Sequence, residues 1–96
     1  MKVVILPQAA AELKDAVEYY EAEQSGLGER LWVEFDQHLG WIAGNATLPR
    51  LRSGAYRRVN FKIFPYYVAY ALREDHIVVL AVSHAARAPE HWIKRG

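Results

Sequence analysis

The spacing of hydrophobic residues changes along the 96-residue chain. Residues 2–6 form a short, β-branched run, which predicts a buried strand that Pro7 ends. From Pro7 to about Glu23 hydrophobic residues recur every three or four positions, which predicts an amphipathic helix. Ser25-Gly26-Leu27-Gly28 breaks this pattern. A second helix is predicted from about Leu27 to Ala43, so the two helices should form an antiparallel hairpin.

The second half of the chain has the alternating pattern of strands. After a loop at residues 44–54, strands are predicted at 56–63, 64–73 and 76–84, with Glu74-Asp75 as a tight turn. The centre of the last strand is apolar on both faces, so we expect it in the middle of the sheet. A basic tail, residues 85–96, follows with one short helical turn.

The predicted order is therefore β-α-α-β-β-β in a single domain, residues 1–96. The helical hairpin should pack on one face of a twisted, mainly antiparallel sheet, which is a two-layer α+β fold. The other face has less cover in this prediction. We therefore expect a functional groove on that face.

Charge is divided unevenly between the two halves of the chain. Residues 1–48 carry three basic and eight acidic residues, a balance of −5, whereas residues 49–96 carry nine basic and three acidic, a balance of +6. A basic half indicates an anionic partner, such as nucleic acid or an acidic protein segment. The alternative is that the two halves attract each other across the fold.

Several functional classes are excluded by missing residues and motifs. The chain has no cysteine, which excludes disulfides and cysteine-based zinc sites. It has no GxGxxG, P-loop or HExxH motif, and the spacing of His84, Glu90 and His91 is not typical of a metal site. We therefore expect no cofactor and no metal. The start lacks the hydrophobic run of a signal peptide, and no run would span a membrane, so a cytoplasmic protein without membrane contact is expected.

Short motifs along nearly the whole chain resemble one family, the RelE/ParE superfamily of toxins from type II toxin–antitoxin systems. The similarity is greatest to the ParE-like and plasmid-stabilisation branch. The matching pieces are Ala10-Ala11-Glu12-Leu13, Tyr19-Tyr20-Glu21, Gly26-Leu27-Gly28, Pro49, Tyr56-Arg57-Arg58, Phe64-Pro65-Tyr66 with Tyr70, Val79-Leu80-Ala81-Val82-Ser83-His84, Arg87, Pro89 and Trp92.

The resemblance implies a toxin that a cognate antitoxin holds inactive in a hetero-oligomer, through an extended or helical arm. ParE-like members poison DNA gyrase, whereas RelE-like members cleave messenger RNA on the ribosome. RelE-like members usually carry an arginine near the position of Tyr66 or Tyr67, which this chain lacks. Because Phe64-Pro65-Tyr66 is commoner in ParE-like members, gyrase is the favoured target. A ribosome-dependent endoribonuclease and an inactive relative that only binds its antitoxin are the alternatives.

Metal-free RNA cleavage needs a base, an acid and cations that stabilise the phosphorane. The candidate catalytic residues, if the protein is a nuclease, are Arg57, Arg58, His84 and Arg87. Neighbouring antiparallel strands are expected to bring residues 57–62 near residues 84–87. The candidate target-binding residues are Arg58, Lys62, Arg87 and Trp92.

Each candidate also has a purely structural interpretation. Arg57 and Arg58 could form a solvated edge or pair with helix acids, and His84 could cap its strand. The tyrosines of the 64–73 strand are more often core residues than platforms for stacking bases. Trp32 and Trp41 lie off the main apolar stripe of their helix, so they are either interface anchors, if exposed, or ordinary core residues.

Overall fold

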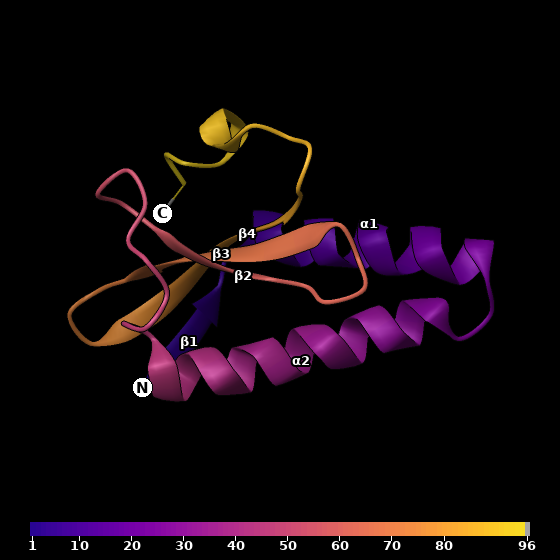
Figure 1. Cartoon of the computed structure of the whole chain (residues 1–96), viewed down its shortest axis with the longest axis horizontal. Helices are drawn as coiled ribbons and strands as arrows, with labels where there is room; N and C mark the ends of the chain where they lie inside the picture. Colours follow the sequence, from indigo (N-terminus) through magenta and orange to yellow (C-terminus); the bar gives the residue numbers. More distant parts are fainter. Residues whose placement is uncertain (96) are drawn as a thin grey trace.

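A computed structural model describes residues 1–95 of the chain. Its elements are β1 (Lys2–Ile5), α1 (Pro7–Glu23), α2 (Leu27–Asn45), β2 (Arg57–Asn60), β3 (Tyr66–Leu72), β4 (His76–His84) and the short 3-10 helix η1 (Pro89–His91). The order and the α+β class agree with the prediction. Figure 1 shows the hairpin of α1 and α2 running along the sheet, and the C-terminal segment on the opposite side.

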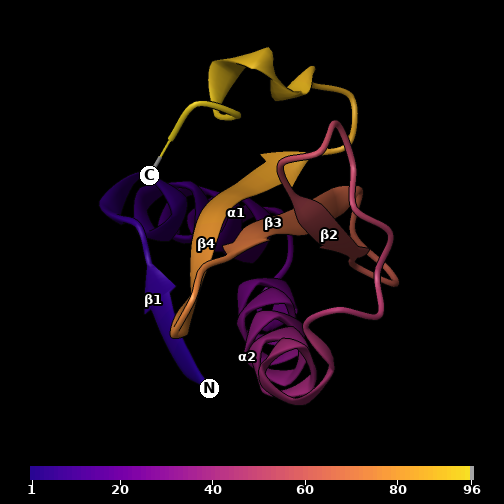
Figure 2. The ribbon, with the colours of Figure 1, turned by 90° about the vertical axis from the view of Figure 1, so that its left-hand side faces the viewer.

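The four strands lie in the order β1-β4-β3-β2. β1 is parallel to β4, with Val3 opposite Ile77, and the other two pairings are antiparallel. β4 therefore has a neighbour on each side, as its apolar centre predicted, whereas β2 lies at an edge. The helical hairpin connects β1 to the rest of the sheet, and Figure 2 shows how the twisted sheet lies between the hairpin and the C-terminal segment.

The face of the sheet toward α1 and α2, here called the helix face, carries the larger core. Leu31, Phe35 and Ile42 of α2 are almost completely buried in it. Alternate residues of β3 face the same core, because successive side chains of a strand point to opposite faces. The buried members of this cluster are Ala9, Ala16, Leu31, Phe35, Ile42, Phe61, Phe64, Val68, Tyr70, Ile77, Val79 and Val82.

The turn between the helices depends on one carboxylate and two glycines. The Glu21 carboxylate accepts hydrogen bonds from the backbone N–H groups of Gly26, at 2.9 Å, and Gly28, at 3.0 Å. Gly26 has a φ of 89°, a conformation that favours glycine. A Cβ at Gly28 would overlap the carbonyl oxygen of Val17, so α1 and α2 approach closely only because this residue has no side chain.

β2 is shorter than the strand predicted at 56–63. After Asn60 the chain bends, and the buried side chains of Phe61 and Phe64 both join the helix-face core, where their ring centres lie 6.3 Å apart. Ile63 is left exposed. A straight strand would have placed successive side chains on opposite faces of the sheet. Because the chain bends instead, both phenylalanines are buried in the same core. The tyrosines of β3 are core residues, as their structural interpretation predicted: Tyr66 and Tyr70 belong to the helix-face core, and Tyr67 is buried on the opposite face.

The opposite face, here called the C-terminal face, is more covered than the sequence indicated. Residues of the C-terminal segment lie across it, and Trp92 is only 1% exposed. The indole ring packs against Tyr56 at 4.7 Å and against Tyr67 at 6.1 Å between ring centres, and its N–H donates to the Tyr67 hydroxyl at 3.2 Å. Small residues of the sheet, including Ala69, belong to the same cluster and leave room for the large ring.

Glu12 of α1 fastens the C-terminal segment to the body of the protein. Its carboxylate accepts a hydrogen bond from the Arg95 guanidinium at 3.0 Å and another from the Val82 backbone N–H at 3.1 Å. The same Arg95 nitrogen donates to the carbonyl of Leu80 at 3.1 Å. At this point the acidic and the basic halves of the chain attract each other directly, which is the alternative that the charge distribution left open.

Candidate functional site

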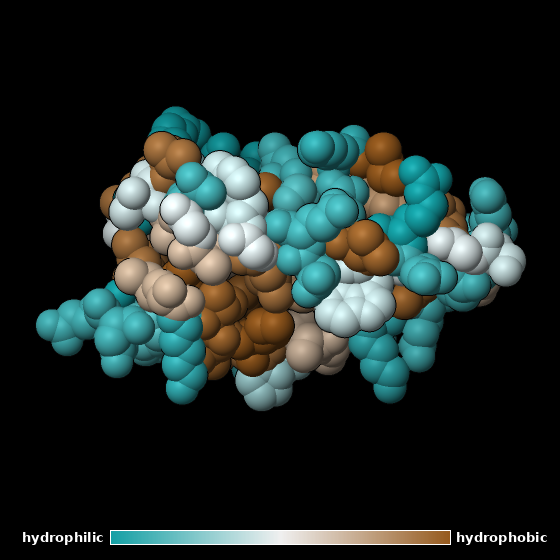
Figure 3. All heavy atoms as spheres, turned by 90° about the horizontal axis from the view of Figure 1, so that it is seen from below, coloured by the Kyte–Doolittle hydropathy of each residue, from teal (hydrophilic) through white to brown (hydrophobic). Residues whose placement is uncertain are grey.

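A groove of about 930 Å³ lies between α2 and β2 and is here called the α2–β2 groove. Three large hydrophobic side chains line it while remaining well exposed: Val33 at 49%, Trp41 at 43% and Ile63 at 56%. Figure 3, which views the molecule from the side of α2, shows hydrophobic side chains gathered between hydrophilic ones. Exposed hydrophobic groups that share one groove are typical of an interaction site.

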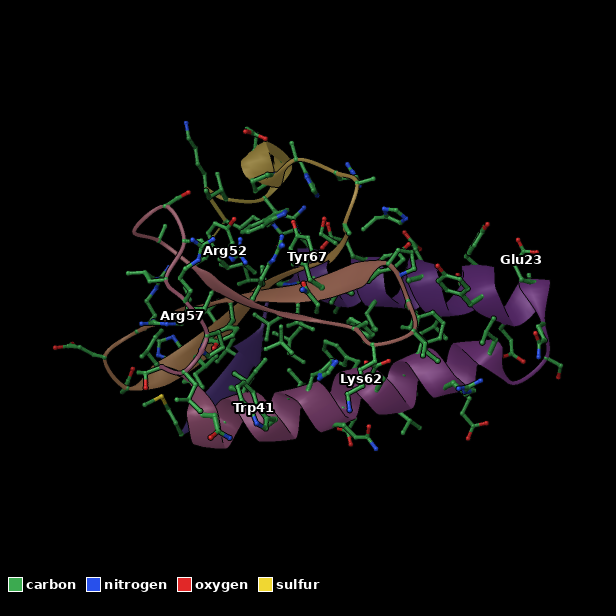
Figure 4. The ribbon with its side chains drawn as sticks, in the orientation of Figure 1. Glu23, Trp41, Arg52, Arg57, Lys62 and Tyr67 are labelled. Atoms are coloured by element: carbon green, nitrogen blue, oxygen red, sulfur yellow. The ribbon has the colours of Figure 1, made fainter. Side chains whose placement is uncertain are left out.

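Trp41 is therefore exposed, which is the condition under which the sequence made it a candidate interface anchor. Trp32 is similarly exposed, at 49%, but it does not line the groove and packs on Phe35 at 5.9 Å between ring centres. Figure 4 shows Trp41 on α2 and Lys62 beyond β2, on the same side of the molecule. Sequence reasoning had no signal for Ile63, because its exposure depends on where β2 ends. Val33 was not singled out either, although, like Trp41, it lies outside the buried residues of α2.

The polar lining of the groove is held in place by Glu34 of α2. Its carboxylate accepts a hydrogen bond from the Lys62 backbone N–H at 2.6 Å and contacts the His38 ring nitrogen at 3.0 Å. The His38 ring also packs edge-on against Phe61 at 5.2 Å. His38 is thus part of the groove. The segment after β2 is tied to α2 through these contacts, which gives the groove a defined wall.

Arg58 of β2 lines the groove, and its guanidinium reaches the C-terminal face of the sheet. Its guanidinium carbon lies 4.8 Å from the centre of the Tyr67 ring, a cation–π contact. Its Nε is buried and has no hydrogen-bond partner among residues 1–95. The Tyr67 ring therefore fixes the position of this guanidinium at the edge of the sheet.

The backbone of β2 adds a second binding element to the groove. β2 pairs with β3 along one side and has no strand on its other side in the described sheet. Arg58, Val59 and Asn60, which belong to this edge strand, also line the groove. An unpaired edge can accept an added strand through main-chain hydrogen bonds.

The candidate nuclease residues do not converge on one site. β3 lies between β2 and β4, so these two strands are not neighbours. The prediction that adjacent strands bring residues 57–62 near residues 84–87 is therefore wrong. Arg57 is opposite Tyr70, and His84 is opposite Tyr66. These two tyrosines are separated by about 13 Å along β3, at roughly 3.3 Å per residue. A base and a cation that act on one phosphate would have to be much closer together.

Individual contacts give these residues structural roles. The Arg57 Nε donates to the carbonyl oxygen of Pro49 at 2.9 Å. The His84 Nδ1 accepts a hydrogen bond from the Ala86 backbone N–H at 3.0 Å, which caps the turn after β4, and the ring packs on Tyr66 at 5.2 Å. Arg87 is exposed in the segment that follows.

Of the four candidate target-binding residues, Arg58 and Lys62 line the α2–β2 groove. Trp92 instead lies inside the core of the C-terminal face. Burial raises the pKa of the Tyr66 hydroxyl, and the nearby Tyr20 raises it further, while the Arg87 charge lowers it. Tyr66 is therefore a neutral core residue at physiological pH. Among the described residues, no cluster of three or more histidine, aspartate or glutamate side chains could hold a metal ion.

Comparison with known proteins connects this fold to a family. A family model described as the ParE toxin of type II toxin–antitoxin systems, parDE, matches residues 3–89. The chain belongs to the ParE toxin family. The family consists of toxins of type II toxin–antitoxin systems, as the resemblance in the sequence implied, and the match lies in the ParE branch of the superfamily.

A solved structure titled "Chromosomal ParDE TA system from P. aeruginosa" is similar to this ParE family member, with a TM-score of 0.63. The match covers 88% of this chain and 95% of the other, at 12% sequence identity. Identity this low shows a shared fold and nothing finer. No curated protein matches the chain.

Proposed function

We propose that this chain is a cytoplasmic toxin that acts on DNA gyrase and that a cognate antitoxin silences by occupying the α2–β2 groove. Membership of the ParE family supports the gyrase target. The separation of Arg57 from His84 across β3 argues against the ribonuclease alternative. None of the helices in residues 1–95 is long and apolar enough to cross a membrane.

The α2–β2 groove carries the antitoxin part of the proposal. Val33, Trp41 and Ile63 offer hydrophobic anchor points, and buried aromatic anchors usually dominate the free energy of binding. The edge of β2 can pair with an extended segment of the arm. Arg58 and Lys62, two cations that line the groove, suit an acidic side chain on that arm through charge-assisted hydrogen bonds.

The target is tested by controlled expression of the chain alone in a bacterium, with separate pulse labels for DNA and protein synthesis. Gyrase poisoning predicts that DNA synthesis falls first and that cells become filamentous. An earlier fall in protein synthesis, with cut messages, would support the ribonuclease instead. Normal growth would indicate an inactive relative that only binds its antitoxin.

The antitoxin site is tested with two tryptophans of one helix. Trp41→Ala removes a side chain that lines the groove, whereas Trp32→Ala removes one of similar exposure outside it. We expect Trp41→Ala to weaken binding of the antitoxin, which should be encoded beside this gene, by about 30-fold or more, the effect of losing a hot-spot residue. Trp32→Ala should change the Kd by less than about threefold. Equal effects would place the antitoxin elsewhere.

A further inference from the structure

A line of aromatic rings crosses the end of the molecule where β4 passes into the C-terminal segment, and Figure 1 shows α1 beside this end of β4. Tyr19 of α1 packs on Tyr20 at 5.1 Å between ring centres. The ring of Tyr66 in β3 lies 6.2 Å from Tyr20 and 5.2 Å from His84 of β4. We propose that this surface, here called the aromatic strip (Tyr19, Tyr20, Tyr66, His84 and Arg87), binds a segment of single-stranded DNA.

The outer rings of the aromatic strip are accessible, whereas the inner rings support them. Tyr20 and Tyr66 pack against the helix-face core. Tyr19 is 59% exposed, and His84 is half-buried. Each outer ring meets an inner ring nearly edge-on, at 85° for Tyr19 and 72° for His84. The fold therefore holds two accessible aromatic rings in fixed positions on one surface.

Arg87 supplies a cation beside these rings. Its side chain is exposed, and within residues 1–95 it has no ion pair with a carboxylate. Burial and the neighbouring Tyr20 and Tyr19 raise the pKa of the Tyr66 hydroxyl, while the Arg87 charge lowers it, so the guanidinium lies near the inner rings. An exposed guanidinium without an acidic partner can bind a phosphate through paired N–H donors.

His84 adds a second donor next to Arg87. The His84 Nδ1 accepts the Ala86 backbone N–H at 3.0 Å, so the proton of the neutral ring is on Nε2. The backbone N–H of Arg87 donates to the His84 carbonyl at 3.0 Å, and this bond keeps the two residues together in one turn. Because phosphate oxygens only accept hydrogen bonds, they suit the Nε2–H and the guanidinium together.

Glu23 determines which end of the aromatic strip receives the phosphate. Its carboxylate is hydrogen-bonded to the Tyr19 hydroxyl, which raises the pKa of that hydroxyl. Figure 4 shows Glu23 at the far end of α1, away from the end of β4. A phosphate is repelled by the carboxylate and attracted by Arg87, so we place the phosphate at Arg87 and a base on Tyr19. The hydrogen bond also holds the Tyr19 ring before DNA arrives, which lowers the entropic cost of binding.

Accessible rings on an open surface suit unpaired bases. Every base has a flat face, so aromatic rings bind single strands with little dependence on sequence. None of the five residues lines the α2–β2 groove, so DNA and an arm in that groove would contact different residues. We choose DNA over RNA because the proposed target, DNA gyrase, acts on DNA, and this choice rests on the proposed function.

The test measures fluorescence anisotropy of a labelled oligothymidylate of about ten nucleotides, with the full chain made by cell-free synthesis to avoid toxicity. We expect a Kd below about 100 µM, and at least about tenfold weaker binding of a duplex of the same length, whose bases are stacked on each other. No binding up to about 1 mM chain would overturn the proposal, as would equal binding of the duplex. Tighter binding of an oligouridylate would overturn the choice of DNA.

Paired variants locate the bound strand. Arg87→Gln should weaken binding by about fivefold or more, whereas Arg50→Gln, which removes the same charge from another exposed position, should leave the Kd within about twofold. Equal losses in both would show a general charge effect and would overturn the site. An unchanged midpoint of thermal unfolding shows that each variant is folded.

A second set of variants tests the ring of Tyr19. Tyr19→Ala should weaken binding by about fivefold or more, the effect of losing one stacked base, while Tyr19→Phe retains the ring and should bind as the wild type does. Trp32→Ala removes an exposed ring of α2 outside the aromatic strip and should leave the Kd within about twofold. Equal losses for Tyr19→Ala and Trp32→Ala would overturn the proposed position of the base.

The binding test uses no gyrase, so its failure is distinguishable from failure of the proposed function. A chain that stops DNA synthesis in cells but does not bind the oligothymidylate would overturn this inference alone. A chain that binds the oligothymidylate through Arg87 and Tyr19 but leaves DNA synthesis intact would support the inference and contradict the gyrase target.

Discussion

The two faces of the sheet are covered in different ways. The helix face carries two long helices that bury a continuous core, including Leu31, Phe35 and Ile42. The C-terminal face carries one short segment, which is held by the single large side chain of Trp92 and by the Glu12–Arg95 ion pair. Terminal segments with few anchors open more easily than packed helices. The comparison indicates that the helix face determines global stability, whereas the C-terminal face can open locally.

The α2–β2 groove and a second, smaller cleft differ in the residues that line them. The α2–β2 groove presents exposed hydrophobic side chains beside an open strand edge, which suits a polypeptide. The second cleft, of about 400 Å³, lies beside the C-terminal segment and is lined mainly by apolar residues, including the almost completely buried Tyr56 and Leu80. The side chains of the neighbouring residues Arg57 and Arg58 point to opposite faces, Arg57 toward Tyr70 of the helix face and Arg58 onto Tyr67 of the C-terminal face.

The largest loss of stability is expected from a substitution in the helix-face core. Phe35→Ala should lower the free energy of unfolding by about 3–5 kcal/mol, because it removes a buried aromatic ring and leaves a cavity. Denaturation by urea measures this change, and loss of a cooperative transition would also agree with it. Val33→Ala, two positions away and half exposed, should cost less than about 1 kcal/mol. A small effect of Phe35→Ala would contradict the assignment of global stability to this face.

A substitution in the core of the C-terminal face should mainly destabilise the C-terminal segment. Trp92→Ala should lower the free energy of unfolding by about 3 kcal/mol at most, the lower end for a buried aromatic, because a terminal segment can relax. Hydrogen exchange should become faster in residues 85–95 while α2 remains protected. Lys94→Ala, an exposed neighbour, is the control and should change neither measurement. Faster exchange throughout α2 would show that the two faces are not independent.

A smaller effect is expected at the ion pair that fastens the C-terminal segment. Glu12→Gln retains the shape of the side chain but removes its charge, which should cost about 1 kcal/mol because both partners are largely buried. Thermal unfolding at low and high salt measures it, and the difference from the wild type should shrink as salt rises. Glu18→Gln, on an exposed part of α1, should be neutral. If both variants behaved alike, Glu12 would have no fastening role.

The smallest effect on stability is expected at alkaline pH, from two tyrosines of the helix face. Burial raises the pKa of the Tyr66 and Tyr70 hydroxyls above the ordinary value of 10.0. The folded state therefore holds these protons more tightly than the unfolded state, so the stabilising contribution is complete below pH 10 and is lost as pH rises through the folded pKa. Tyr66→Phe should reduce the fall in stability above pH 10. The free energy of unfolding is measured against pH for the wild type and the variant. If the slope above pH 10 were the same in both, the buried Tyr66 hydroxyl would not be the cause of the fall in stability.

Much of the fold was predictable from local patterns. The bounds of α1 and the central place of β4 both depend on hydrophobic spacing, which is a local property. The early end of β2 was not predictable, because Phe61 and Phe64 enter a core formed by distant helices. The cover that Trp92 gives to the C-terminal face was also missed, since one tryptophan in a basic tail carries no periodic signal.

The candidate site shows the same division. The sequence by itself determined that Arg57, Arg58 and His84 would lie on strands, and the short motifs determined the family. Only the tertiary structure decided that β3 separates β2 from β4, which keeps Arg57 apart from His84. The physical reason is that strand order depends on contacts between residues far apart in the chain, whereas strand and helix formation depends on the spacing of near neighbours.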